Sequence, residues 1–212
     1  MDLLQAHEVR VLGALIEKEA TTPEYYPLSL NALVNACNQK SNRDPVVNFD
    51  EDTVLDAIER LRAKQLAFII TGSGRVHKYS QRISETLNLG RRELTVLCTL
   101  LLRGPQTLGE IKDRSDRMYS FTDLSETERV LEKLSEWPGG ALANRLPRQP
   151  GQKESRYAHL MSGEPVIEAQ PESAGAVTSG GRIGELEQEI RQLRSEFDEL
   201  KSRFEALEAQ LR

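Results

Sequence analysis

The sequence predicts a mostly helical protein with small β-hairpins, an α+β fold in which one order of elements occurs twice. Over residues 50–80, a helical apolar pattern ends directly before a short strand, a glycine turn and a returning strand. The same order returns over residues 123–161. Helices followed by a two-stranded hairpin are typical of the winged helix-turn-helix. We therefore predict two tandem winged-helix domains, a flexible linker and a coiled-coil helix, at residues 1–82, 83–162, 163–182 and 183–212.

In the first domain, apolar residues at helical spacing predict helices over about residues 5–20, 28–39 and 50–64. Asp50 and the acidic residues after it suit a helix start, where free N–H groups and the positive end of the helix dipole favour them. Residues 66–71 form a short, apolar and partly β-branched segment, which favours a strand. Gly72 and Gly74 allow the chain to reverse direction, so residues 76–80 can form the returning strand.

The second domain repeats these features. Residues 93–97 align with residues 8–12, and Thr107 with Glu110 has the spacing of a capping box. Asp123 and Glu126 have the same spacing at the start of the third helix. Strands are expected over residues 142–146 and 156–161, around a turn at Pro150 and Gly151, and residues 83–89 join the two domains.

A polar loop over residues 38–45 is longer than the usual connection in a helix-turn-helix. In one interpretation its amides and hydroxyls satisfy their own backbone as turn and cap residues. In the other it is a binding loop that presents Lys40 and Arg43. The sequence leaves both open, with the first favoured.

The stretches over residues 20–31 and 35–46 resemble the YceH family of uncharacterised bacterial proteins. The likeness continues through Gly90-Arg91-Arg92-Glu93-Leu94 and Arg156-Tyr157-Ala158-His159-Leu160, so it covers about residues 1–163. The resemblance implies a tandem winged-helix fold. It implies no activity, substrate or catalytic residue.

The last 30 residues follow a heptad in which apolar residues alternate at spacings of three and four. Three pairs that would meet in a parallel pair of helices, among them Glu189 with Arg194, are opposite in charge. We expect a parallel homo-oligomer, preferably a dimer, although a trimer or pairing with another protein fits the same pattern. The expected oligomerisation residues are Ile183, Leu186, Ile190, Leu193, Phe197, Leu200, Phe204, Leu207 and Leu211.

Composition narrows the class of protein further. The net charge of −5 belongs to residues 164–212, so the two domains are near neutral and give no global basic field. Cys37 and Cys98 are too few for a disulfide framework or a metal site. The chain lacks a basic, apolar leader and any apolar run of membrane-spanning length, so we expect a cytoplasmic protein without a membrane partner. Without catalytic motifs, we expect no enzyme, catalytic residue or cofactor.

Two partners remain for a binding protein of this kind. The third helices are acidic, which opposes insertion into the major groove of DNA because phosphate contacts dominate affinity. The hairpins and the polar loop are basic, so we narrowly favour double-stranded DNA over the alternative, a protein–protein interaction scaffold. The candidate nucleic-acid contacts are Lys40, Arg43, Arg75, Lys78, Arg145, Arg148, Lys153 and Arg156.

Overall fold

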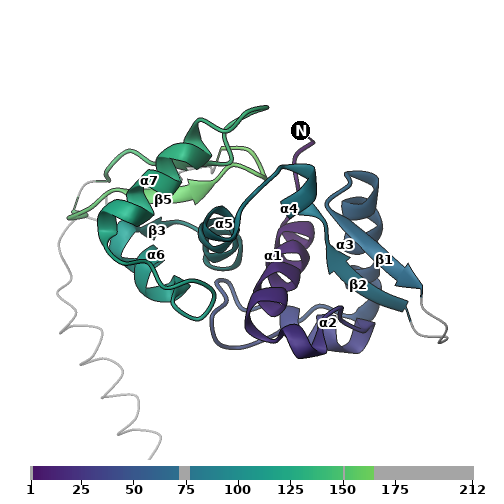
Figure 1. Ribbon diagram of the computed structural model, residues 1–212. Coiled ribbons are helices and arrows are strands. Elements are labelled where there is room, and N and C mark those ends of the chain that lie inside the picture. The colour runs from purple at the N-terminus through teal and green to yellow at the C-terminus, as the bar shows by residue number, and fades with distance from the viewer. Residues whose placement is uncertain (1, 72–76, 150, 165–212) are drawn as a thin grey trace, which may run out of the picture. The chain divides into compact units, whose positions relative to one another are not determined.

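Two long helices, α1 (Ala6–Thr21) and α5 (Arg91–Arg103), pack side by side at the centre of the folded region (Figure 1). The computed structural model describes residues 2–71, 77–149 and 151–164, and all of these belong to one compact unit. Both predicted domains lie within that unit, and we call residues 2–82 the first half and residues 83–164 the second half. The predicted coiled coil, with all nine expected oligomerisation residues, lies outside the described residues, as does the predicted linker beyond Glu164.

The first half contains the three helices and the hairpin expected from the sequence. Ser29 and Asp50 cap the second and third helices by accepting hydrogen bonds from the N–H groups of Ala32 and Thr53. Ile69 faces Tyr79 in the antiparallel hairpin. The elements that follow α1 are η1 (Pro23–Tyr25), α2 (Leu30–Cys37), α3 (Glu51–Ala63), β1 (Ala67–Thr71) and β2 (His77–Gln81).

The second half begins with a short helix, α4 (Ile83–Thr86), and its later elements repeat the order of the first half. At the start of α6, Thr107 and Glu110 form the predicted capping box in both directions. After α5 come β3 (Gln106–Thr107), α6 (Leu108–Ser115), α7 (Leu124–Ser135), β4 (Ala143–Arg145) and β5 (Arg156–His159). The structure therefore confirms a mostly helical α+β fold with small antiparallel sheets.

The predicted capping box at the start of α7 forms only in part. Asp123 accepts a hydrogen bond from the Glu126 N–H at 2.7 Å, as expected. The Glu126 carboxylate instead accepts from the backbone N–H and the hydroxyl of Thr122, at 2.9 and 3.0 Å. The spacing correctly identified Asp123 as the cap. The Glu126 carboxylate, however, binds the donors of Thr122 in the turn before the helix.

A third strand in the second half has no counterpart among the sequence predictions. The two residues of β3 pair with β5, so the sheet order is β3-β5-β4. In the first half, Leu28 lies just before α2, as β3 lies just before α6, and it makes a single antiparallel β-bridge to Tyr79. Two residues are too few to show the alternation by which a strand is recognised.

Each half has its own layer of buried leucine and isoleucine, and the two layers meet along α1 and α5. Leu12, Leu15 and Ile58 are fully buried in the first half, as are Leu97 and Leu131 in the second. Burying each such side chain contributes on the order of 1.5–3 kcal/mol. All of them belong to one continuous core, which explains why the two halves form one unit.

Gly13 lies where α1 and α5 approach each other. A Cβ atom at Gly13 would lie 2.8 Å from Leu102 Cδ2 and 3.3 Å from Leu101 Cβ. Beside it, the Cys98 thiol donates a hydrogen bond to the Gly13 carbonyl at 3.3 Å. The missing side chain therefore permits this helix packing.

Candidate functional site

The predicted nucleic-acid contacts are spread over the folded unit. Lys78 is exposed on β2, at one end of the unit in Figure 1. Arg145, Arg148 and Lys153 are exposed on or near the β4–β5 hairpin, on the other side of the central helices. Lys40 is exposed in the polar loop. Arg75 lies outside the described residues. The structure thus does not bring the candidate residues of the two hairpins together.

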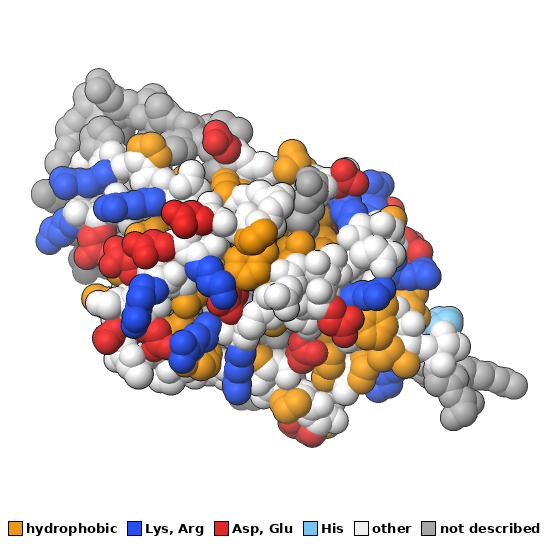
Figure 2. All heavy atoms as spheres, turned by 45° about the horizontal axis from the view of Figure 1, so that its top comes forward, with side chains coloured by type: hydrophobic (Ala, Val, Ile, Leu, Met, Phe, Trp, Pro, Cys, Tyr) orange, Lys and Arg blue, Asp and Glu red, His pale blue; other side chains and the backbone are white. Residues whose placement is uncertain are grey.

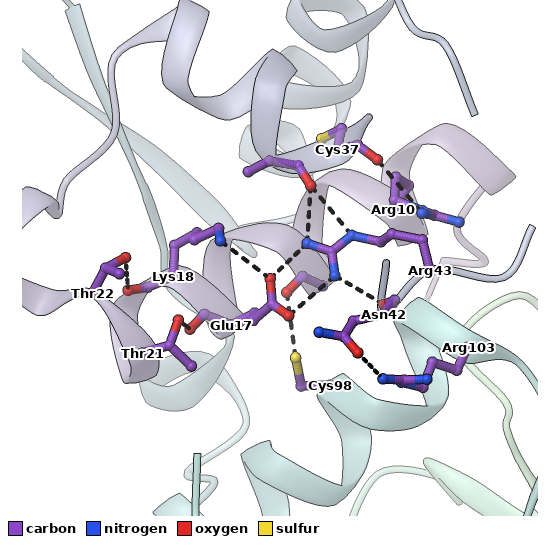
Figure 3. A network of polar contacts seen from close by, with 12 residues as sticks. Arg10, Glu17, Lys18, Thr21, Thr22, Cys37, Asn42, Arg43, Cys98 and Arg103 are labelled. Carbon is purple, nitrogen blue, oxygen red and sulfur yellow. Dashed lines mark hydrogen bonds and ion pairs between the residues drawn. The ribbon is translucent and has the colours of Figure 1, made fainter. Parts of the chain in front are cut away.

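Arg43 is not a surface residue, so the prediction that it contacts nucleic acid is wrong. Its side chain is fully buried and makes a two-pronged ion pair with Glu17 at 2.6 and 3.1 Å (Figure 3). The same guanidinium donates to the Ala36 carbonyl at 2.9 Å. These contacts saturate most of its donors within the protein.

The loop that carries Arg43 joins the two halves. The Asp44 N–H donates to the Leu102 carbonyl of α5 at 2.9 Å, and Asn42 accepts a hydrogen bond from Arg103. Within the first half, Arg10 of α1 also holds the loop by donating to the Pro45 carbonyl at 2.5 Å. The length and polarity of residues 38–45 therefore serve packing between the halves, which neither sequence interpretation included.

Arg156 is also engaged within the protein. It donates to the Pro105 carbonyl at 2.9 Å and to the Glu110 carboxylate at 3.1 Å. Burial opposes ionisation of Glu110, but the Thr107 N–H and Arg156 outweigh it and lower the pKa of Glu110. Arg156 is thus a poor candidate for a nucleic-acid contact in this conformation.

On α3, the exposed basic side chains are paired with carboxylates. Arg60 binds Asp56 at 2.7 Å, and Arg62 binds Glu59 at 2.8 Å. Because these are surface pairs one turn apart, each contributes only a few tenths of a kcal/mol, on the order of 0.3–0.5. These pairs do, however, change the charge that α3 presents. The carboxylates of Asp56 and Glu59 neutralise Arg60 and Arg62, while Glu51 and Asp52 remain exposed at the start of the helix.

The end of each third helix is tied to the start of the first helix in the same half. Lys64 binds the buried Glu8 at 2.6 Å, and Lys133 binds Glu93 at 2.6 Å. Burial opposes the charge on Glu93, but Lys133 outweighs it and lowers the pKa of the carboxyl. Because Glu8 and Glu93 are equivalent in the repeat, the internal duplication extends to this ion pair.

A groove of about 150 Å³ lies between α7 and the β4–β5 hairpin. Glu128 and Glu132, one turn apart on α7, line one side, and Arg145 and Tyr157 line the hairpin side, where the tyrosine ring supplies apolar surface. Burial raises the pKa of Tyr157, and the nearby Glu128 and Glu132 raise it further although Arg145 opposes them. The spacing of the two glutamates is readable in the sequence, but their position beside the hairpin is not.

The face shown in Figure 2 carries Lys and Arg side chains interspersed with Asp and Glu, and neither sign forms a continuous patch. Hydrophobic side chains gather near its middle. A pocket of about 280 Å³ lies between the N-terminal segment, α4 and the turn after α7, lined by Leu3, Leu87 and Trp137 among others. The Leu4 N–H donates to the Met161 carbonyl at 2.7 Å beside it, so the N-terminal segment also joins the two halves.

The thiols and the histidines form no metal centre within the described part of the chain. Residues 2–71, 77–149 and 151–164 contain no group of three potential His, Cys, Asp or Glu ligands. Cys37 and Cys98 are both buried, and burial raises the pKa of the Cys37 thiol to about 12. Neither thiol is therefore primed as a nucleophile. In the same ranges, no helix has the length and apolarity needed to span a membrane.

Known proteins similar to this chain share its pattern over most of its length. Residues 4–152 match a family described as a protein of unknown function, DUF480. A UPF0502 protein of Solibacter usitatus is 54% identical over 196 residues, covering 90% of this chain and 93% of that protein. A UPF0502 protein of Geotalea daltonii is 58% identical over 189 residues, 86% of each chain. The chain therefore belongs to this DUF480/UPF0502 family, the YceH-like family that its sequence resembles.

Proposed function

We propose that the protein is a non-enzymatic adaptor that binds another protein through the acidic third helices of two tandem winged-helix domains. The observation that carries this proposal is the pairing on α3, where Arg60 and Arg62 are each offset by a carboxylate of the same helix. A third helix with its cations offset and its carboxylates exposed repels phosphates. It suits a partner with a positively charged surface.

The second half offers the more defined surface. Its groove combines the carboxylates of Glu128 and Glu132 with the ring of Tyr157, and Arg145 lines it from the hairpin. This combination favours an extended or helical segment that carries both basic and apolar side chains, since the two carboxylates and the tyrosine ring then have complements. The element order of each half, three helices and a hairpin, supports the winged-helix assignment.

Charge reversal on α7 tests the adaptor directly. Glu128→Lys with Glu132→Lys should abolish capture of the partners that the wild-type protein retains from the lysate of its own cells. The matched control is Glu154→Lys with Glu164→Lys, which makes the same charge change at exposed positions that do not line the groove. The proposal fails if the α7 variant and the control retain the same partners as the wild type.

The second hairpin favours DNA as a second candidate partner. Arg145, Arg148 and Lys153 are exposed, and no described carboxylate lies within ion-pair distance of them. Three such cations suit contacts with a phosphate backbone that carry no sequence information. If this candidate is correct, Arg148→Ala with Lys153→Ala should weaken binding to duplex DNA and flatten its salt dependence. Unchanged binding by that variant would remove the hairpin from the candidate interface.

A further inference from the structure

A pocket of about 270 Å³ lies where the loop over residues 38–45 meets the second half. Glu17 and Thr21 of α1 and Asn42 of the loop line it from the first half. The second half contributes three arginines, Arg103 at the end of α5 and Arg114 and Arg117 on and after α6. The volume falls just below the ~300–1,000 Å³ typical of small-molecule pockets, so any ligand is small.

Arg103 is a partly buried cation without an anionic partner among the described residues. Its guanidinium donates to the side-chain oxygen of Asn42, a neutral acceptor, as Figure 3 shows. Burial lowers the pKa of Arg103, and the positive charges of Arg114 and Arg43 lower it further, although the carboxylates of Glu17 and Asp44 partly oppose this shift. Desolvating a cation beside other cations is unfavourable, and an anion in the pocket would relieve that cost.

The carboxylates around the pocket do not supply this anion. Glu17 is committed to Arg43 at 2.6 Å, as Figure 3 shows. Glu110 is shared between Arg114 at 3.3 Å and Arg156 at 3.1 Å. Asp113 also lines the pocket, but it is exposed, and none of the ion pairs among the described residues includes it or Arg117. The pocket thus keeps an excess of guanidinium groups.

Guanidinium groups recognise phosphate in particular, because their forked donors match two oxygens at once. We propose that this pocket binds the phosphate group of a small ligand, held by Arg103, Arg114 and Arg117. The ligand would contact α1, the loop and α6 together, so its binding would strengthen the junction between the two halves. The site is separate from the acidic surface of α7 and does not depend on the proposed partner.

Calorimetric titration of the full-length protein tests this site, first with inorganic phosphate and then with adenosine monophosphate, at a constant ionic strength of about 0.1 M. We expect saturable binding at one site and a rise in Tm with phosphate concentration. Arg117→Gln should weaken binding by about tenfold or more, since it removes a charge-assisted hydrogen bond to the phosphate. Arg117 is exposed, so this variant should keep the fold. Tighter binding of the nucleotide than of phosphate would identify a phosphomonoester as the ligand.

Arg82→Gln is the matched control, because it removes one exposed arginine that does not line the pocket. It should leave phosphate binding unchanged. The proposal is overturned if the wild-type protein binds neither phosphate nor the nucleotide, or if Arg82→Gln weakens binding as much as Arg117→Gln. Binding of duplex DNA alone, lost in Arg117→Gln, would also overturn the small-ligand assignment and would instead assign the arginines to a DNA backbone.

Discussion

At the scale of single residues, the buried ion pair of Arg43 with Glu17 fixes the loop between α2 and α3. Arg43→Ala leaves the Glu17 carboxylate almost buried, with only the more distant Lys18 at 3.7 Å. Breaking a buried pair in this way costs about 3–5 kcal/mol because an uncompensated charge remains. We therefore expect a loss of that size in the free energy of unfolding, measured by urea denaturation.

Lys40 provides the control for Arg43 within the same loop. Because Lys40 is exposed, Lys40→Ala should change the free energy of unfolding by less than about 0.5 kcal/mol. A variant with Arg43→Ala that unfolds at the same urea concentration as the wild type would contradict the structural role of this arginine.

His159 makes stability depend on pH. Burial lowers its pKa from 6.5 to about 4, and its Nδ1 atom has no hydrogen-bond partner among the described residues. The unfolded chain therefore binds a proton near pH 6.5 that the folded protein accepts only near pH 4. Stability should fall by up to about 3 kcal/mol as the pH decreases through this window.

The pH prediction is measured by urea denaturation between pH 7.5 and pH 4.5. His159→Gln should remove most of the slope between pH 6.5 and pH 4.5, whereas the same substitution at the exposed His77 should leave it intact. Carboxylates with lowered pKa values, such as Glu93, also lose stabilisation on acidification, but below about pH 4.5. An identical pH profile for wild type and His159→Gln would refute the assignment.

At the scale of elements, the close packing of α1 on α5 depends on the absence of a side chain at Gly13. Gly13→Val would place methyl groups against Leu101 and Leu102, and overpacking of this kind costs about 1–3 kcal/mol. Thermal unfolding should show the loss as a lower Tm. Gly109→Ala on α6 is the control, because a Cβ atom there meets nothing within 4 Å and helix propensity improves. Equal Tm values for Gly13→Val and wild type would show that the two helices tolerate a wider separation.

The sequence predicted the helices and hairpins well because their signals are local. Asp50 begins α3, and Thr107 with Glu110 caps α6, as their spacing indicated. The short strand β3 was missed because it exists only through its pairing with β5. Arg43 was assigned to the surface because nothing in the loop itself indicates a partner 26 residues earlier, at Glu17.

At the scale of the whole molecule, the described residues form one unit in which the N-terminal segment and the loop over residues 38–45 both cross between the halves. Neither crossing is visible in the sequence, since Leu4 and Met161 become neighbours only after both halves fold. The groove beside α7 could not be predicted from the sequence for the same reason. Its two sides come from α7 and from the hairpin, which become neighbours only in the folded protein.

The heptad over residues 183–212 predicts the assembly state of the whole chain. A shortened protein that ends at Gly163 should be a monomer by multi-angle light scattering, whereas the full-length protein should be an oligomer, preferably a dimer. Oligomers of the shortened protein would instead place the interface on residues 1–163.

The most direct test of the proposed function is fluorescence anisotropy of the full-length protein with a labelled random-sequence duplex, from about 20 to 200 mM salt. Because the third helices are acidic and the cations of α3 are offset by carboxylates, we predict no salt-dependent binding across this range. Binding that weakens linearly in a log–log plot, and that Arg148→Ala with Lys153→Ala reduces, would contradict the adaptor and identify DNA as the partner.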